Sequence, residues 1–234
     1  MLPLKDDVPS HSFPIVTVLL IAANVAAFLY QMSLEFGGAA GAAGAAEAFV
    51  LEFGAVPCRL TGRCPLEEFP APLLTVMTSM FLHGGLFHVG GNMLYLWIFG
   101  DNIEDTLGHF RFILLYVMAG LAAVTAQTAV DPGSQIPMIG ASGAVSGVLG
   151  AYLFLFPRAS ILTLITFGFF IRFVQVPAIL VLGFWVVVQF FNGFLTYAAG
   201  GQEGGGVAWF AHIGGFVVGV GLLFLLKPRA TRRL

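Results

Sequence analysis

The chain has 234 residues, of which 58% are hydrophobic and only 9% are charged. Since an average soluble protein has roughly 25% charged residues, this composition excludes a soluble fold and indicates an integral membrane protein. The formal net charge of −2 argues against a nucleic-acid partner. The apolar segments are continuous and do not alternate with polar residues, which argues against a transmembrane β-barrel. We therefore predict an all-α, polytopic membrane protein whose partners are met in the lipid bilayer.

Six segments are apolar and long enough, or nearly so, to cross the membrane as helices, which takes about 20 residues. In chain order they cover residues 15–34, 88–107, 112–130, 141–156, 174–197 and 207–226. The chain is thereby divided into an N-terminal segment (1–14), a membrane domain (15–226) that includes a long outer loop (35–87), and a basic C-terminal segment (227–234). No internal repeat is visible.

Basic residues indicate the orientation of the spans, because Lys and Arg in short loops stay on the cytoplasmic side. With the N-terminus inside, eight of the ten basic residues are cytoplasmic, and only Arg59 and Arg63 lie outside. Both termini are thus predicted to be cytoplasmic, in a bacterial-type plasma membrane. The first span has an alternative interpretation as a secretory signal, because the small-residue tract at 37–46 contains many Ala-x-Ala triplets. Otherwise this tract is expected to be a flexible linker or an Ala-rich helix.

Two further stretches are apolar although they are not counted as spans. Residues 70–87, in the outer loop, carry no charge and are expected to lie in the outer interface or to dip into it. Residues 161–171, between Arg158 and Arg172, are too short to cross the membrane. We expect them to form a cytoplasmic interfacial segment.

Strongly polar side chains are costly inside a membrane, so each of them is a functional hypothesis. His88 and Asn92 lie at i and i+4 on one face of the second span, near its outer end. Ser142 opens the fourth span, and His212 lies in the sixth. These four residues are predicted at similar depths on the outward side. Taken singly, Ser142 is better explained by a bond to its own helix backbone. His212 is more informative, because a histidine in lipid requires a partner, although it could also be a satisfied core residue.

Glycine spacing indicates how Ser142 and His212 could meet. Small residues recur at helical spacing around both, at Gly140, Gly143 and Gly147 in the fourth span and at Gly215 and Gly219 in the sixth. Such faces let two helices approach closely, which would bring Ser142 Oγ within hydrogen-bonding reach of the His212 imidazole. That is the arrangement of a nucleophile and its base, although no acidic residue lies at a matching depth to complete a triad.

Hydrogen-bond donors for the oxyanion of a tetrahedral intermediate are also present. His88 and Asn92 can supply side-chain donors, and the backbone N–H of Ser142, at the start of its helix, can supply a third.

These residues resemble the rhomboid family of intramembrane serine proteases. The resemblance covers residues 75–226 and rests on motifs in the same order, namely Phe87-His88 with Asn92, the spacing of Gly100, Glu104 and Gly108, Gly140-Ala141-Ser142-Gly143, and Ala211-His212 with Gly215 and Gly219. It implies a six-helix rhomboid-like bundle with Ser142 as nucleophile, His212 as general base and acid, and His88 and Asn92 in the oxyanion site. It also implies cleavage of single-span transmembrane substrates near the outer membrane face, without a cofactor.

The sequence departs from the family pattern at two positions. Many rhomboids have Trp-Arg in the outer loop, whereas this loop has no Trp and its Arg59 follows Cys58. Some members place a tyrosine that stacks on the histidine four residues after the nucleophile, where this chain has Ser146. Glu104 is interpreted as structural, because it lies at the cytoplasmic end of the second span.

Two other functions compete with the protease. A catalytically inactive rhomboid-like protein that binds membrane clients is expected to lack the serine or the histidine, and both are present. A small transporter is expected to show paired charges at mid-membrane or an internal repeat. No metal site is predicted, because a His-Glu-x-x-His motif is absent and the histidines are scattered. His83, in the outer loop, is expected to contact lipid headgroups or water.

Two predictions concern the surroundings of the site. Trp185 and Phe190, between Gly183 and Gly193 in the fifth span, are expected to form a gate through which a substrate helix enters sideways. Cys58 and Cys64 are the only cysteines, and both fall in the outer loop, where oxidising conditions favour a disulfide. Two free thiols and a zinc site are the alternatives.

Overall fold

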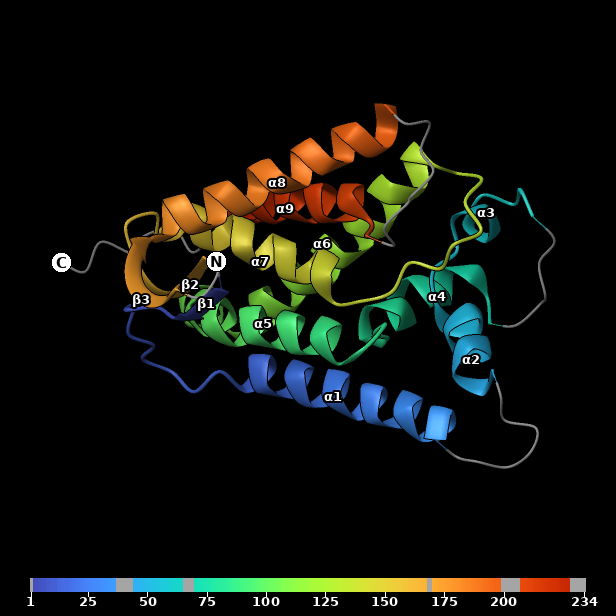
Figure 1. Ribbon diagram of the computed structural model, residues 1–234, viewed down its shortest axis with the longest axis horizontal. Coiled ribbons are helices and arrows are strands. Elements are labelled where there is room, and N and C mark those ends of the chain that lie inside the picture. The colour runs from blue at the N-terminus through green and yellow to red at the C-terminus, as the bar shows by residue number, and fades with distance from the viewer. Residues whose placement is uncertain (1, 37–43, 65–69, 168–169, 199–206, 228–234) are drawn as a thin grey trace.

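The structure is a computed structural model that describes residues 2–36, 44–64, 70–167, 170–198 and 207–227 (Figure 1). Each predicted span becomes one helix within a few residues of the expected bounds. These helices are α1 (Ile15–Phe36), α5 (Leu86–Leu107), α6 (His109–Val130), α7 (Ser142–Leu155), α8 (Ala178–Ala198) and α9 (Trp209–Leu226). The prediction of a helical, polytopic membrane protein is confirmed.

The helices differ in how well each could cross a bilayer alone. Among the described residues, α1, α6, α8 and α9 are long and apolar enough to span a membrane. A fifth candidate consists of α5 together with the short helices α4 (Pro72–Thr78) and η1 (Ser79–Phe81), which are bent by 82° relative to it. Helix α7 has only 14 residues, but every residue from 143 to 152 is buried. It is therefore the central helix, and it packs against α5, α6, α8 and α9 (Figure 1).

Close contact between α7 and α9 follows from their glycines. A Cβ added at Gly215 would lie 2.0 Å from the carbonyl oxygen of Gly143, and one added at Gly219 would lie 2.3 Å from Cα of Gly147. Any side chain at these positions would push the helices apart, so the predicted small-residue contact is confirmed. Gly140 does not belong to this helical face. It precedes α7 with φ +117°, a conformation that L side chains rarely adopt.

A small antiparallel sheet, which the sequence did not predict, lies beside the helices. Its order is β1 (Leu2–Lys5), β2 (Ser160–Phe167) and β3 (Phe170–Pro177). The stretch predicted as an interfacial segment thus forms a hairpin with the N-terminus added as a third strand. β-Branched and aromatic residues dominate this stretch and favour strands. Because β3 continues to Pro177, α8 begins four residues later than the fifth span was predicted to begin.

The sheet and the outer loop lie at opposite ends of the molecule (Figure 1). We call these the sheet end (β1–β3) and the loop end, which comprises α2 (Ala45–Phe53), α3 (Pro57–Leu60) and α4. At the loop end, the uncharged stretch at 70–87 forms α4, η1 and the start of α5 and packs into the bundle, with Met80 only 3% exposed. Within the tract at 37–46, residues 37–43 lie outside the described residues, and α2 begins at Ala45.

Candidate active site

Ser142 is the first residue of α7, and the turn before it sets its position. The Gly140 N–H donates to the carbonyl of Ser79, at 2.9 Å, which ties this turn to η1. Since Ser142 opens the helix, its own backbone N–H has no acceptor within the helix.

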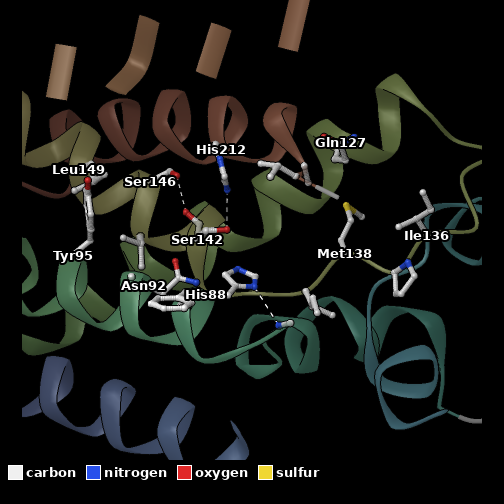
Figure 2. Close-up of a pocket in the computed structure, with 18 of the residues that line it drawn as sticks. His88, Asn92, Tyr95, Gln127, Ile136, Met138, Ser142, Ser146, Leu149 and His212 are labelled. Atoms are coloured by element: carbon white, nitrogen blue, oxygen red, sulfur yellow. Dashed lines mark hydrogen bonds between the residues drawn. The ribbon is translucent and has the colours of Figure 1, made fainter. Parts of the chain in front are cut away.

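The structure brings Ser142 and His212 together. Ser142 Oγ lies 2.8 Å from Nε2 of His212, although 70 residues separate them in the chain (Figure 2). The glycine contact between α7 and α9 explains this distance, because it holds the two backbones close enough for short side chains to meet. The pair thus has the geometry of a nucleophile hydrogen-bonded to its base.

A third side chain, which the sequence analysis missed, lies behind His212. Gln189 Oε1, from α8, is 2.7 Å from Nδ1 of His212. The Gln189 Nε2 donates to the carbonyl of Trp185, one turn earlier, at 3.3 Å. A glutamine in an otherwise apolar span was the signal that could have revealed it, because such a residue is costly in lipid unless it has a partner.

The two residues expected to form a gate lie in different surroundings. Trp185 lines the cavity at the site, and its ring centroid is 6.0 Å from that of His212, with the planes tilted by 35°. The Trp185 ring therefore lies beside the His212 imidazole. Ser146, at the tyrosine position, donates instead to the carbonyl of Ser142, at 2.6 Å (Figure 2). Phe190 is 50% exposed and is not among the residues that line the cavity.

His88 and Asn92 lie on the opposite side of Ser142 from His212 (Figure 2). The Gly84 N–H donates to Nδ1 of His88, at 3.2 Å, so the ring hydrogen is carried by Nε2. A Cβ at Gly140 would lie 2.7 Å from that Nε2 and 3.6 Å from Ser142 Oγ. The His88 ring and the Ser142 hydroxyl therefore lie on either side of Gly140, and both residues line the cavity described below. Asn92 Nδ2 is buried and has no hydrogen-bond partner among the described residues.

His83 is placed differently from its prediction. Its side chain does not contact lipid headgroups or water, because it is only 2% exposed. Gln31, on α1, accepts from the His83 N–H at 3.0 Å and donates to its carbonyl at 3.2 Å. The imidazole then packs edge-on against that of His88, with centroids 5.0 Å apart. The expectation was wrong because residues 70–87 fold back into the bundle, where His83 supports His88.

A cavity of about 450 Å³ joins these residues, which is within the usual range for ligand sites. It extends from Ile136 and Met138, in the loop before α7, past Ser142 to Tyr95 and Leu149 (Figure 2). Much of its lining is apolar, and the polar groups gather around Ser142. Among the described residues, no group of three or more His, Cys, Asp or Glu side chains could hold a metal ion.

The outer loop is attached to the rim of this cavity. Cys58 and Cys64, predicted as a pair, form a disulfide in the structure. The Cys58 N–H donates to Ser134 O at 2.9 Å, and Thr61 Oγ1 donates to Pro132 O at 2.7 Å. The disulfide-closed ring thus holds the segment that leads to Ser142.

Comparison with known proteins identifies a rhomboid domain over residues 70–229. The chain belongs to the rhomboid family. Rhomboid protein 1, mitochondrial, of Saccharomyces cerevisiae is 31% identical over 163 residues, which cover 66% of this chain and 42% of the yeast protein. RHOMBOID-like protein 1 of Arabidopsis thaliana is 32% identical over 156 residues, covering 66% and 35% of the two chains.

A bacterial relative matches a shorter region. Rhomboid protease GluP of Bacillus subtilis is 39% identical over 79 residues, covering 34% of this chain and 15% of that protein. The matched region is less than half the length of each of these three relatives.

Proposed function

We propose that this rhomboid is an intramembrane serine endopeptidase that uses Ser142 and His212 to cleave transmembrane proteins. The observation that carries the proposal is the 2.8 Å contact between Ser142 Oγ and His212 Nε2 beside a cavity. A serine hydroxyl is a weak nucleophile until a base accepts its proton. A half-buried serine and histidine that are in contact at the start of a central helix are suited to that reaction.

The reaction would proceed through an acyl-enzyme. His212 Nε2 accepts the hydroxyl proton as Ser142 Oγ attacks the scissile carbonyl carbon. His212 then returns this proton to the nitrogen of the leaving amine, and the peptide bond breaks. Water, deprotonated by His212 in the same way, attacks the ester and releases the second product and Ser142.

The negative charge on the carbonyl oxygen needs preorganised donors. We assign this role to His88 Nε2–H, Asn92 Nδ2–H and the backbone N–H of Ser142. The support is that His88 and Asn92 line the same cavity as Ser142 and that Asn92 Nδ2 makes no hydrogen bond to the described residues. Donors that are already oriented stabilise the transition state without reorganisation, and each contributes on the order of 3 kcal/mol.

The distribution of charge supports a site that opens to the extracytoplasmic side. Lys5, Arg158 and Arg172 lie in or beside the strands at the sheet end, whereas Arg59 lies in α3 at the loop end (Figure 1). Because basic loops stay in the cytoplasm, the sheet end is assigned to the cytoplasmic side of a bacterial-type plasma membrane. Ser142, which begins α7 on the side of the loop end, then lies near the outer face.

Single-span transmembrane proteins are the proposed substrates, and α8 is the proposed gate. Peptide bonds inside a helix are protected by their hydrogen bonds, so a substrate helix has to unwind beside Ser142. Trp185 and Phe190 lie on α8, of which only five of 21 residues are buried. A helix with so little of its surface packed against the bundle can move at a low energetic cost.

Cleavage by purified protein tests the proposal. The wild type, reconstituted in detergent or liposomes, is incubated with a single-span test substrate beside Ser142→Ala and Ser146→Ala. We expect cleavage by the wild type and by Ser146→Ala, but none by Ser142→Ala. A wild type that binds the substrate without cleaving it would instead support the inactive client-binding protein.

A further inference from the structure

Gln189 differs from every other buried residue of the proposed gate helix. The described buried positions of α8 are Ala178, Val181, Leu182, Gln189 and Gly193, so Gln189 is the only one with a polar side chain. It is 5% exposed. A primary amide at such a position loses its hydration and is tolerated only if both of its ends find partners.

Both ends of this amide are occupied, which fixes its orientation. Nε2 donates to the Trp185 carbonyl of the same helix, so the amide oxygen has to point the other way. That oxygen lies 2.7 Å from His212 Nδ1. The assignment of oxygen and nitrogen therefore follows from the hydrogen bonds themselves.

The amide oxygen in turn determines where the histidine carries its hydrogen. A carbonyl oxygen can only accept, so the neutral imidazole must have its hydrogen on Nδ1. Its Nε2 is then an unprotonated acceptor that faces the hydroxyl of Ser142, at 2.8 Å. In the other tautomer, Nε2–H would face the serine hydroxyl, and His212 could not act as the base.

We propose that Gln189 is a positioning residue that holds His212 in the tautomer and orientation required to accept the proton of Ser142. Gln189 thus occupies the place of the acidic residue in a catalytic triad, with a neutral amide that a low-dielectric site accommodates more easily than a carboxylate. This inference rests on the proposed function. It adds that the histidine depends on a side chain from the proposed gate helix.

One substitution distinguishes a positioning role for Gln189 from a purely structural one. Gln189→Met has nearly the same length and volume and keeps the packing, but it has no oxygen to accept from Nδ1. Gln189→Glu retains an acceptor oxygen at the same distance. Asn192→Leu is the matched control, because the Asn192 amide also donates to the backbone of α8, at Val188 O, whereas the side chain that contacts His212 Nδ1 from this helix is Gln189.

Kinetics on the single-span test substrate provide the decisive measurement. We expect Gln189→Met to lower kcat by about ten- to a hundredfold, the loss expected when an oriented hydrogen bond to a reacting group is removed. KM should stay within about threefold, because Gln189 does not line the cavity. Gln189→Glu should recover kcat to within about tenfold of the wild type, and Asn192→Leu should stay within about twofold. The ¹⁵N resonances of the His212 ring should show Nδ1–H in the wild type and lose it in Gln189→Met.

A result that contradicts this inference can be distinguished from one that contradicts the proposed function. If Gln189→Met retained the kcat of the wild type, Gln189 would have no positioning role, whereas a wild type without any cleavage would contradict the proposed function itself. If Gln189→Met does not fold, Gln189→Asn replaces it, because its amide is one methylene too short to reach Nδ1. The same loss of kcat is then expected, and its absence would overturn the inference.

Discussion

Two of the polar centres among the described helices, one around Glu104 and one around Ser142, use their hydrogen-bonding groups differently. At the sheet end, Glu104 accepts from the N–H groups of Val16 and Thr17, both at 2.8 Å, and from Thr17 Oγ1 at 2.7 Å. The fourth contact of the Glu104 carboxylate is His109, whose Nδ1 lies 2.5 Å from Glu104 Oε1. The carboxylate is fully used to cap α1, so the structural interpretation of Glu104 is confirmed.

At the loop end, by contrast, only some of the polar groups around Ser142 have hydrogen-bond partners. Asn92 Nδ2 has no partner among the described residues, and the His88 ring makes a hydrogen bond to them through Nδ1 but not through Nε2. An unsatisfied donor in an apolar surrounding costs stability, so such groups persist where a ligand or a transition state uses them. At these two centres, the Glu104 carboxylate is fully hydrogen-bonded, whereas the candidate catalytic site retains a buried donor without a partner among the described residues.

The largest expected effect is the loss of cleavage when the Ser142 and His212 pair is broken. Ser142→Ala and His212→Ala should each lower kcat by about a thousandfold or more, and the double variant should be no worse than either single variant, because the two groups act as a unit. Steady-state cleavage of the test substrate measures this. Residual activity above a tenth of the wild type in Ser142→Ala would point to another nucleophile, with Ser146 as the first candidate.

Removing one of the unused donors should have the next largest effect. His88→Ala or Asn92→Ala should lower kcat by about a hundredfold and leave KM nearly unchanged, since an oxyanion donor acts mainly in the transition state. Separate determination of kcat and KM checks this. A raised KM with an unchanged kcat would reassign these residues to substrate binding.

Glu104 should behave in the opposite way. Glu104→Ala leaves buried donors on α1 without an acceptor and should lower the free energy of unfolding by about 3 kcal/mol. The kcat of the fraction that remains folded should stay within about twofold, because Glu104 lies at the other end of α5 from His88. Denaturant unfolding followed by cleavage assays measures both quantities. A loss of kcat without a loss of stability would remove the distinction between the two centres.

The disulfide should contribute a smaller stabilisation, confined to the loop end. Opening the ring between Cys58 and Cys64 should cost about 2 kcal/mol by loop entropy. It should also raise KM, because the ring holds the segment at 131–139 that lines the cavity. Thiol labelling should require prior reduction. Two reactive thiols per chain in unreduced, denatured protein would show that the pair is not bonded.

The smallest expected effect concerns the gate. The sequence predicted the same role for Trp185 and Phe190, but the structure places them in different surroundings. Phe190→Ala removes an exposed side chain and should raise kcat/KM about threefold if gate opening limits the rate. Trp185→Ala also removes the ring that packs against His212, so its net effect should be a decrease. Equal acceleration by both substitutions would mean that the Trp185 ring has no role in holding the histidine.

The sequence predicted the parts of the fold that depend on local pattern. Long apolar runs gave the six helices, and the spacing of Gly143, Gly147, Gly215 and Gly219 indicated the contact that brings Ser142 to His212. The hairpin at 160–177 was missed because a short apolar run is equally compatible with a strand and an interfacial segment. Gly140 was assigned to a helical face because spacing alone does not reveal where a helix begins.

The remaining features of the candidate site depend on tertiary contacts. Gln189 was missed because its partner, His212, is 23 residues away on another helix. His83 was expected to contact lipid headgroups or water in the outer loop, since no local pattern showed which distant side chains would cover it. In each case, a polar residue in an apolar surrounding was visible, whereas its partner was fixed only by the packing of distant segments.

Covalent labelling with a fluorophosphonate, followed by mass spectrometry of the modified peptide, tests the central claim most directly. This reagent reacts preferentially with activated serines, so the modified peptide identifies the nucleophile without assuming a substrate. We predict one adduct, on Ser142, that is lost in His212→Ala and retained in Ser146→Ala. An adduct on Ser146, or undiminished labelling of Ser142 without His212, would contradict the assignment of Ser142 and His212 as nucleophile and base.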